Sequence, residues 1–439
     1  MVKKVVIIGA GPSGVLLAHY LLRRGDQYQV DIYEGRSDPR IVSFSQSRTF
    51  PISLGDRGIK VLQQIPQLGE AIKPVSTEIK GTIVHRKNGK TQATQRQKPL
   101  IALDRSNLAK VLLDKLVENY DQSRLNINFN CRCVKVDFAA KQAKLHKINV
   151  DNPTEIETEF TIDYDLLIGA DGAKSVVREN LSNLDEFEFE QEYVVNGYKS
   201  IFLSNPTAIP EINLQKGKLH TWRIDAGVTI LLLYQPDGKM NGVVLFPYAK
   251  NPIAELKNTE QVLRFFRDNF PEVGQLMLES EAEEFAQKPI SRITTVRCNR
   301  YHQGDSVLLI GDAAHSVSAS IAQGCNSALE DVLVFNQLLD EYADNLELAL
   351  EQYSIRRKPD ADALRELSDY SFPLSKGLFI EFLIRQYSAK FLNKLFPQKF
   401  SPPLLEVVFE STIPYREVYR NYQGWLNKVK KSNAKYLIN

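Results

Sequence analysis

The feature that most constrains this chain is a glycine-rich turn near its N-terminus. The turn, GAGPSG at residues 9–14, follows an apolar run at 5–8 and precedes a helix-like segment at 15–24. A second strand-like run, 29–33, then leads directly to Glu34. This order of strand, glycine turn, helix, strand and acidic residue predicts a βαβ unit that binds a dinucleotide.

Each part of this unit has a physical role. Gly9 permits a tight turn, Gly11 lets the backbone approach a pyrophosphate, and Gly14 lets the helix sit against the strand. The helix N-terminus offers unpaired N–H groups and a positive dipole end to the phosphates, and Glu34 can accept hydrogen bonds from a ribose diol. The alternative is a glycine-rich turn in an ordinary α/β domain, which the complete context disfavours.

Bulk composition excludes several classes of protein. With 439 residues, the chain exceeds the size at which one core keeps growing, so we expect more than one domain. A net charge of +2 gives no reason to expect nucleic acid as a partner. Four cysteines form no disulfide framework, which favours the reducing cytoplasm. The pair Cys131 and Cys133 lacks a second pair at metal-ligand spacing, so no metal site is predicted.

Two later motifs repeat the pattern of a buried strand that ends in a glycine turn. Residues 165–178 read as a strand, a Gly-Ala-Asp-Gly turn and a new helix, and 306–315 read as a strand that ends in Gly-Asp. A loop then leads to the sequence QGCN at 323–326 and a long helix over 327–342. Between these motifs, runs such as 228–234 alternate with turns, which is typical of an antiparallel meander.

Together, the three motifs resemble the class A flavoprotein aromatic hydroxylases of the para-hydroxybenzoate hydroxylase type. Several stretches are similar to the kynurenine 3-monooxygenase family: RTFPISLGDRG, HRKNGK, LHTWR, VLLIGDAAHSVSASIAQGCNSALEDVLVFNQLLDE and YSIRRKPDADALRELSDYSF. This resemblance implies an α/β fold with a Rossmann-like FAD-binding domain of the GR2 type, an antiparallel-sheet substrate domain and a helical C-terminal region. The expected divisions are 1–184 (with substrate-side elements inserted near 70–100), 185–292, 293–358 and 359–439.

The resemblance also implies the residues that contact FAD. These are Gly9, Gly11, Ser13, Gly14, Glu34, Arg36, Ser53, Arg105, Cys133, Asp312, Gly324, Cys325 and Asn326. A helix N-terminus near Gly324 would stabilise the negative charge of a reduced flavin. Alternatives remain: Asp312 as an N-cap, Arg105 as a solvated charge at a helix end, and His315 in a structural rather than a catalytic role.

The implied chemistry lies largely in the cofactor, so no catalytic side chain is predicted. NADPH or NADH reduces FAD as a transient donor, and the sequence contains no second Rossmann motif for that donor. Addition of O2 gives a flavin C4a-hydroperoxide, which hydroxylates an aromatic small molecule. The protein shields this intermediate from water and positions the aromatic ring.

The expected substrate pocket departs from the kynurenine 3-monooxygenase pattern. Thr82 replaces the arginine that binds the amino-acid carboxylate, Ser371 replaces an asparagine, and Tyr415 is retained. Losing the guanidinium removes a bidentate carboxylate clamp. We therefore expect a substrate other than kynurenine, such as an indole or phenolic metabolite.

Three other functions remain open. A flavin-dependent halogenase would need paired tryptophans, but Trp222 and Trp425 are far apart. A flavin-dependent reductase of an apolar, lipid-like substrate fits the apolar C-terminal third. A membrane-surface flavoprotein is suggested by the basic tail 416–435 with its interleaved Tyr419, Tyr422 and Trp425. A solvated helix that covers the active site is the favoured interpretation of that tail, and the stretch 372–387 carries too many charges for an ordinary membrane span.

Overall fold

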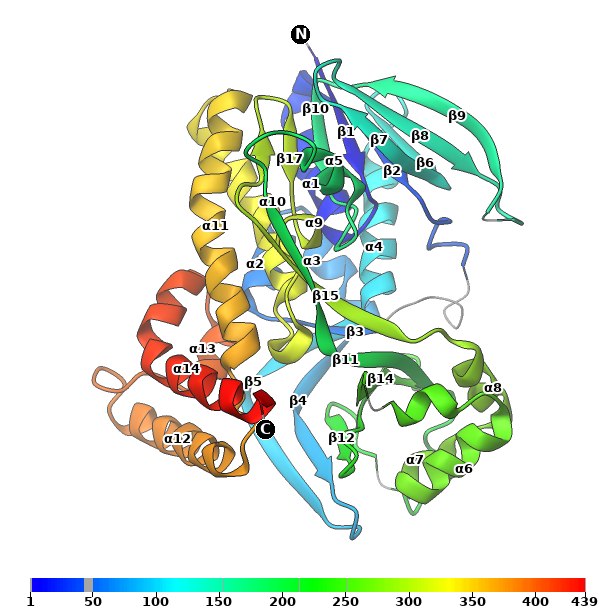
Figure 1. The fold of residues 1–439 in the computed structure, drawn as a ribbon, viewed down its shortest axis with the longest axis vertical. Helices are drawn as coiled ribbons and strands as arrows, with labels where there is room; N and C mark the ends of the chain where they lie inside the picture. Colours follow the sequence, from blue (N-terminus) through cyan, green and yellow to red (C-terminus); the bar gives the residue numbers. More distant parts are fainter. Residues whose placement is uncertain (1, 43–49, 153, 213, 250, 439) are drawn as a thin grey trace.

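The fold was analysed in a computed structural model, which describes residues 2–42, 50–152, 154–212, 214–249 and 251–438 (Figure 1). Residues 36–49 are polar and turn-rich in the sequence, and 43–49 of them, which include the first two residues of RTFPISLGDRG, lie outside the described residues. The described strands form three sheets, and a helical region follows them in the chain.

A six-stranded sheet forms the first layer, with strand order β16-β17-β10-β1-β2-β6. Its members are β1 (Lys3–Ile8), β2 (Tyr28–Glu34), β6 (Leu125–Phe129), β10 (Leu166–Gly169), β16 (His302–Gln303) and β17 (Val307–Leu309). All neighbouring pairs are parallel except β16 with β17. The apolar runs seen in the sequence are buried here because helices cover this sheet, as in other parallel sheets.

Helices pack around this sheet and share its buried apolar core. They are α1 (Pro12–Leu22), α2 (Asp56–Gln63), α3 (Leu68–Ala71), α4 (Arg105–Asn119), α5 (Val176–Leu181), α9 (Asp312–His315) and α10 (Gly324–Glu341). Helix α1 packs against both α4 and α10. The predicted dinucleotide-binding βαβ topology is confirmed: β1, α1 and β2 follow one another, and β1 pairs with β2 in parallel.

A three-stranded sheet of β7 (Cys131–Asp137), β8 (Gln142–Ile148) and β9 (Ile156–Asp163) lies beside this layer. The alternating pattern of 126–136 in the sequence predicts a single strand, but this prediction is wrong, since β6 and β7 belong to different sheets. Asn130 separates them with a φ of 57°, a left-handed conformation that asparagine tolerates better than most residues. Cys131 and Cys133 are two positions apart on β7, so their side chains share one face of the strand, and both are buried.

The eight-stranded sheet has the order β15-β11-β14-β13-β12-β4-β5-β3. Its strands are β3 (Pro51–Leu54), β4 (Ser76–His85), β5 (Thr91–Asp104), β11 (Phe189–Leu203), β12 (Leu219–Arg223), β13 (Thr229–Tyr234), β14 (Met240–Pro247) and β15 (Ser291–Cys298). The predicted meander is confirmed, because β12, β13 and β14 pair antiparallel in sequence order. Helices α6 (Thr259–Asn269), α7 (Pro271–Leu276) and α8 (Glu279–Gln287) pack with it through a core that includes Phe266.

The C-terminal region consists of α11 (Leu346–Tyr370), α12 (Lys376–Leu395), α13 (Leu404–Glu410) and α14 (Tyr415–Ile438). Helix α11 runs through Pro359, so the boundary set at 358/359 falls inside a helix, and the domain limits stay a prediction. A separate apolar cluster joins α11, α13 and α14 to the segment after α9. Figure 1 shows α11 beside the six-stranded sheet, with α12 to α14 at the periphery.

Candidate cofactor and substrate site

The three glycine motifs meet at the carboxyl edge of the six-stranded sheet. Gly9 has a φ of +109°, and a Cβ placed on it would lie 2.4 Å from the carbonyl oxygen of Ala170 in the second motif. A Cβ on Gly14 would lie 2.3 Å from the carbonyl oxygen of Gly9. A Cβ on Gly311, in the third motif, would lie 2.9 Å from Ser13 Oγ. Glycine is therefore required here to let the three turns approach one another.

Gly11 has a different environment from its neighbours. Within the described part of the chain, no atom lies within 4 Å of the position that a Cβ on Gly11 would occupy. Its carbonyl accepts the first intrahelical hydrogen bond of α1, from Val15 N–H at 3.0 Å. The space beside Gly11 therefore lies at the positive end of α1, where a pyrophosphate fits.

Glu34 fastens the end of β2 to the glycine turn. Its Oε2 accepts a hydrogen bond from Ala10 N–H at 2.9 Å, and its Oε1 accepts one from Arg36 N–H at 3.0 Å. The carboxylate is thereby held in one orientation while its remaining lone pairs stay available to a ribose. The Arg36 side chain is exposed beside it.

Cys133 lies in the buried lining next to the second motif. Burial, followed by the nearby charge of Asp171, raises the pKa of its thiol to about 12. The thiol is therefore neutral at physiological pH. The resemblance implies that Cys133 contacts adenine through its backbone, and this contact stays a prediction.

The N-terminus of α10 supplies a second set of donors. The first intrahelical hydrogen bond runs from Ser327 N–H to Gln323 O at 2.9 Å, so the N–H groups of Gly324, Cys325 and Asn326 precede it. The buried Asn326 side chain ties this helix to β3, because its Oδ1 accepts from Gly55 N–H and its Nδ2 donates to Ser53 O, both at 2.9 Å. Ser53 is thereby brought to the start of α10.

Two charged residues near the start of α10 affect the pKa of the Cys325 thiol. Burial raises its pKa to about 12, while the charge of Arg105 lowers that pKa and the charge of Asp312 raises it. Arg105 and Asp312 therefore both lie close enough to Cys325 to affect its ionisation. These three residues come from α4, α9 and α10 and are brought together only by the fold.

The structure bears differently on the alternatives given for Asp312 and Arg105. Asp312 is the first residue of α9, whose N-cap is Gly311, so Asp312 is not the cap of this turn. The N-cap of α4 is Asp104, which accepts from Ser106 N–H at 2.7 Å. Arg105 follows it as the first residue of α4 with intermediate exposure, which leaves its alternative as a charge at a helix end open. The cofactor contacts of both residues stay predictions.

Gln323 is a candidate site residue that the sequence interpretation missed. Its side chain is completely buried, and its Oε1 accepts a hydrogen bond from Tyr415 Oη at 2.8 Å. Its Nε2 has no partner among the described residues. A buried amide N–H without a partner is costly, so it points to a bound ligand. The only signal in the sequence was its place in QGCN, immediately before the helix.

Tyr415 is held on its other side by an arginine. The Arg57 guanidinium lies 4.0 Å from the centre of the tyrosine ring, and burial raises the pKa of Tyr415. Arg57 also donates to Glu330 and to the carbonyl of Ile413. The phenol thus reaches the α10 N-terminus as part of a fixed arrangement.

A buried ionic network centred on Asp331 supports the turn at Gly311. Asp331 Oδ2 accepts from Gly311 N–H at 2.8 Å and pairs with His315 Nε2 at 2.7 Å, while Asp331 Oδ1 accepts from Arg357 Nε at 2.9 Å. Burial by itself raises the pKa of Asp331, but the charges of His315 and Arg357 outweigh it and hold that pKa below its ordinary value. This geometry favours the structural role predicted for His315.

The predicted substrate residues are only partly brought together. Ser371 is completely buried and its Oγ donates to Leu367 O at 2.5 Å, close to the apolar cluster that contains Tyr415. Ser53 on β3 and Thr77 on β4 both pair with Ala102 of β5, so these three residues form one row across the sheet. Thr82 lies on β4 five residues beyond Thr77. At the usual rise per residue, that is about 17 Å from this row. The substrate roles of Thr82, Ser371 and Tyr415 stay predictions.

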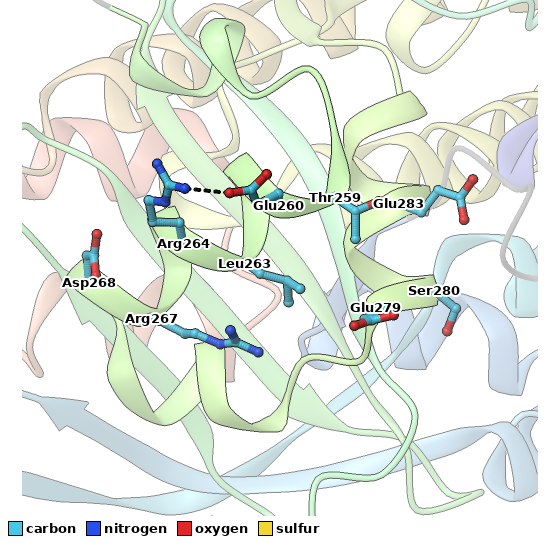
Figure 2. Close-up of a pocket in the computed structure, with 9 residues that line it drawn as sticks. All are labelled: Thr259, Glu260, Leu263, Arg264, Arg267, Asp268, Glu279, Ser280 and Glu283. Carbon is cyan, nitrogen blue, oxygen red and sulfur yellow. Dashed lines mark hydrogen bonds and ion pairs between the residues drawn. The ribbon is translucent and has the colours of Figure 1, made fainter.

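A surface hollow elsewhere has none of these features. Figure 2 shows it between α6 and α8, where Arg264 pairs with Glu260 among other exposed polar side chains. None of the three glycine motifs contributes to it. Within the described ranges, no group of three histidine, cysteine or acidic side chains is placed to hold a metal ion.

Comparison with known proteins supports the cofactor assignment. Residues 3–368 match the protein family described as FAD binding domain. Kynurenine 3-monooxygenase of Drosophila willistoni is 31% identical over 432 residues, which cover 95% of this chain and 90% of that protein. Its counterpart in Caenorhabditis elegans is 28% identical over 428 residues, covering 94% and 91% respectively.

Solved structures share the fold at lower identity. The tetrameric form of 2-methyl-3-hydroxypyridine-5-carboxylic acid oxygenase has a TM-score of 0.67 and 20% identity, covering 84% of this chain and 91% of that one. A variant of HpxO from Klebsiella pneumoniae, complexed with FAD, has a TM-score of 0.61 and 18% identity, covering 83% and 87%. Likeness at this level of identity establishes the architecture alone.

Proposed function

Since the chain belongs to the FAD binding domain family and, within it, to the kynurenine 3-monooxygenases, we propose that it hydroxylates an aromatic substrate other than kynurenine. Its class is that of an FAD-dependent aromatic hydroxylase. NADPH or NADH is the proposed electron donor, O2 the co-substrate and the cytoplasm the proposed compartment. The four cysteines of the sequence, all free thiols, support that compartment.

The residues at the sheet edge fit FAD. The open space at Gly11 and the positive end of α1 suit the pyrophosphate, Glu34 suits the ribose, and the N–H groups at the start of α10 suit an electron-rich ring edge. FAD, when bound, supplies the redox chemistry that passes electrons from the nicotinamide donor to O2. The chain's own part is to orient the ring system through α10 and to keep water out with the buried side chains around Gln323 and Tyr415.

The substrate proposal depends on how the described cations beside Thr82 are already engaged. Lys218 Nζ would lie 3.0 Å from a Cβ on the neighbouring Gly81, and it donates to Gln95 Oε1. The basic side chains nearest to Thr82 on the β4–β5 hairpin are already paired: Lys80 with Glu78 at 3.7 Å, and Arg96 with Glu410 at 3.0 Å. The Arg96 guanidinium also lies 5.3 Å from the ring centre of Phe409. A substrate carboxylate would have to displace one of these pairs. An uncharged aromatic such as an indole or a phenol fits better.

A substrate screen tests this proposal. Purified protein loaded with FAD is mixed with NADPH or NADH and with kynurenine, indoles and phenols, and O2 consumption is compared with the amount of hydroxylated product. The expected result is substrate-stimulated flavin reduction and stoichiometric product with an indole or phenol. Efficient hydroxylation of kynurenine would overturn the substrate proposal and leave the assignment as a flavin hydroxylase intact. O2 consumption without any hydroxylated product would count against the proposed reaction itself.

A further inference from the structure

An arginine of the eight-stranded sheet lies between two tyrosine rings. The central carbon of the Arg292 guanidinium is 4.3 Å from the ring centre of Tyr193 and 4.1 Å from that of Tyr248. Both tyrosines are open to solvent in part, with exposed fractions of 49% and 44%. Stacking on two rings fixes the plane of a guanidinium and leaves its N–H edge to meet a partner. These three residues are called the arginine cage below.

A β-bulge brings the three side chains together. The register of β11 against β15 shifts between Tyr193 and Gly197, and Gly197 pairs with Arg292. The displaced segment contacts the end of β14 instead, since Tyr248 N–H donates to Val195 O at 3.0 Å. A Cβ on Gly197 would lie 3.3 Å from Cδ2 of Tyr248, so glycine leaves room for this ring beside the guanidinium. Bulges often re-aim side chains in this way next to functional sites.

The charge of Arg292 has no acidic partner in the described part of the chain. The neighbouring basic residues Lys288 and Arg297 each pair with a carboxylate, and the residues outside the description include no aspartate or glutamate. Arg292 Nη2 donates to Val194 O at 3.4 Å, and its buried Nε has no partner among the described residues. A guanidinium with a fixed plane and open N–H groups is suited to bind a phosphate or a carboxylate.

One side of the cage leads to the start of α10. Tyr198 pairs with the residue before Arg292, and its ring centre lies 5.8 Å from that of Phe50. The Phe50 carbonyl accepts a hydrogen bond from Arg105 N–H at 3.3 Å. Arg105 is the residue whose charge lowers the pKa of Cys325. The cage is therefore connected by direct contacts to the proposed flavin site.

The other side of the cage leads to the third glycine motif. Tyr193 pairs with Thr294 of β15, and the Thr294 carbonyl accepts from Ser316 Oγ at 2.7 Å. Val296 N–H donates to Ser316 O at 2.8 Å. Ser316 directly follows α9, the helix that begins at Asp312. Figure 1 shows β11 and β15 side by side, running from the six-stranded sheet toward α8. A ligand on the cage would thus lie beside the cofactor edge.

The basic tail 416–435 has no comparable arrangement. The sequence suggested its aromatic residues as a surface-binding face. Among the described residues, no helix has the length and apolar character needed to cross a membrane. Tyr419, Tyr422 and Trp425 pack against the buried cluster that joins α11, α13 and α14. The rings of the arginine cage are more open than these and are better placed to stack with a small ligand.

We propose that the arginine cage binds a phosphate of the nicotinamide donor, an inference that rests on the proposed hydroxylase function. The donor needs a site of its own, because the sequence contains no second Rossmann motif. It also enters and leaves in every turnover, which suits a cage open to solvent better than the buried lining around Gln323. Arg292 would meet the phosphate with its N–H edge, and the open faces of the tyrosine rings would stack with the nicotinamide or adenine ring.

Two binding measurements on the FAD-loaded protein test the proposal. Anaerobic stopped-flow reduction by NADPH and by NADH gives an apparent Kd and a limiting rate, and calorimetric titration with NADP⁺ and NAD⁺ gives a Kd without turnover. For Arg292→Gln, the expected result is a Kd raised about tenfold or more in both measurements, with a limiting rate within about twofold of the wild type. Arg292→Lys should lie between the two, because lysine keeps the charge but not the planar fork.

The tyrosines and the choice of nucleotide give separate readouts. Tyr193→Leu combined with Tyr248→Leu should raise the Kd several-fold, since the guanidinium loses the rings that orient it. An equal loss for both nucleotides would support contact with the pyrophosphate that they share. A loss confined to NADPH and NADP⁺ would support contact with the 2′-phosphate that only these carry.

Arg223→Gln and Tyr387→Leu are the matched controls, because Arg223 is an exposed arginine of β12 and Tyr387 is a 61% exposed tyrosine of α12. Both should bind the donor like the wild type. The proposal is overturned if the Arg292 variants bind both nucleotides like these controls. It is also overturned if they lose FAD or if dithionite reduces their flavin as slowly as the donor does, because Arg292 would then be structural. A wild-type flavin that neither nucleotide reduces would overturn the proposed function, and this inference with it.

Discussion

The cofactor edge and the substrate side of this molecule are built by different means. At the cofactor edge, Gly9, Gly14 and Gly311 let backbone segments meet where any side chain would clash. On the substrate side, long-range side-chain contacts such as Gln323 to Tyr415 and Arg96 to Glu410 set the geometry. A close approach of two backbone segments requires glycine and is therefore visible in the local sequence, whereas a side-chain contact between distant segments has no local sequence pattern. The first region was therefore readable before the fold was known, and the second was not.

The largest expected effect is a loss of folding stability when the buried ionic network around Asp331 is disrupted, because both regions pack against this network. Asp331→Asn removes the buried charge that pairs with His315 and Arg357, and it leaves Glu330 and Asp360 as the remaining acidic partners of the Arg357 guanidinium. We expect a loss of about 3–5 kcal/mol in the free energy of unfolding, measured by urea denaturation at neutral pH. Asp340→Asn, on the same helix but 61% exposed and paired with Arg24, should cost less than about 1 kcal/mol. Equal losses in the two variants would contradict the buried network.

The pH dependence of the same variant has a definite sign. Because the folded pKa of Asp331 is depressed, its stabilisation is present above the ordinary carboxyl value. It disappears as the pH falls through the lower folded value. The wild type should thus lose stability below about pH 4, and Asp331→Asn should show a shallower loss over that window. Parallel acid profiles would show that Asp331 is not the responsible group.

A pair of glycine variants separates folding from binding at the cofactor edge. Gly14→Ala places a Cβ 2.3 Å from Gly9 O and should destabilise the protein by about 1–3 kcal/mol. Gly11→Ala meets no described atom within 4 Å, so the apoprotein should keep its stability while FAD binding weakens about tenfold or more. Thermal melts of the apoprotein and FAD titrations check both. A Gly11→Ala protein that binds FAD like the wild type would break the contrast between these two glycines.

Gln323→Leu probes the substrate side. The change removes the buried amide while nearly keeping its size, and it leaves the Tyr415 hydroxyl without its acceptor. We expect the affinity for the aromatic substrate to fall by about 1.4 kcal/mol, roughly tenfold, and the flavin absorption spectrum to shift. Gln423→Leu, on the exposed surface of α14, is the control. A spectrum and affinity identical to that control would place Gln323 outside the site.

The smallest expected effect concerns substrate choice. Thr82→Arg should raise kcat/KM for kynurenine by less than about tenfold, because it restores a guanidinium but not the rest of a carboxylate site. Thr91→Arg, at the exposed tip of the same hairpin, should leave the value unchanged. A gain of similar size from both variants would indicate a general charge effect rather than recognition at position 82.

Particular residues show how far sequence could lead. The glycine turn at 9–14, the strand that ends at Glu34 and the strand before Gly311 were predicted correctly because each leaves a local pattern in the sequence, while the cofactor contacts of these residues stay predictions. The break at Asn130 was missed because alternating polarity continues across it, and the passage of α11 through Pro359 was missed because proline usually ends a helix. Gln323 carried no local signal, since its burial and its contact with Tyr415 depend on segments 92 residues apart. The exposure of α12 could not be predicted either, because the sequence pattern of an apolar helix is the same whether the helix is buried or exposed.

The central claim is that the three glycine motifs form one FAD site. Titration of the apoprotein with FAD and with FMN, followed by flavin fluorescence, tests it most directly. The account predicts one FAD per chain and binding of FMN at least about 100-fold weaker, because FMN lacks the pyrophosphate and adenosine that Gly11, Glu34 and the N-terminus of α1 are placed to hold. Failure to bind FAD, or equal affinity for the two flavins, would contradict it.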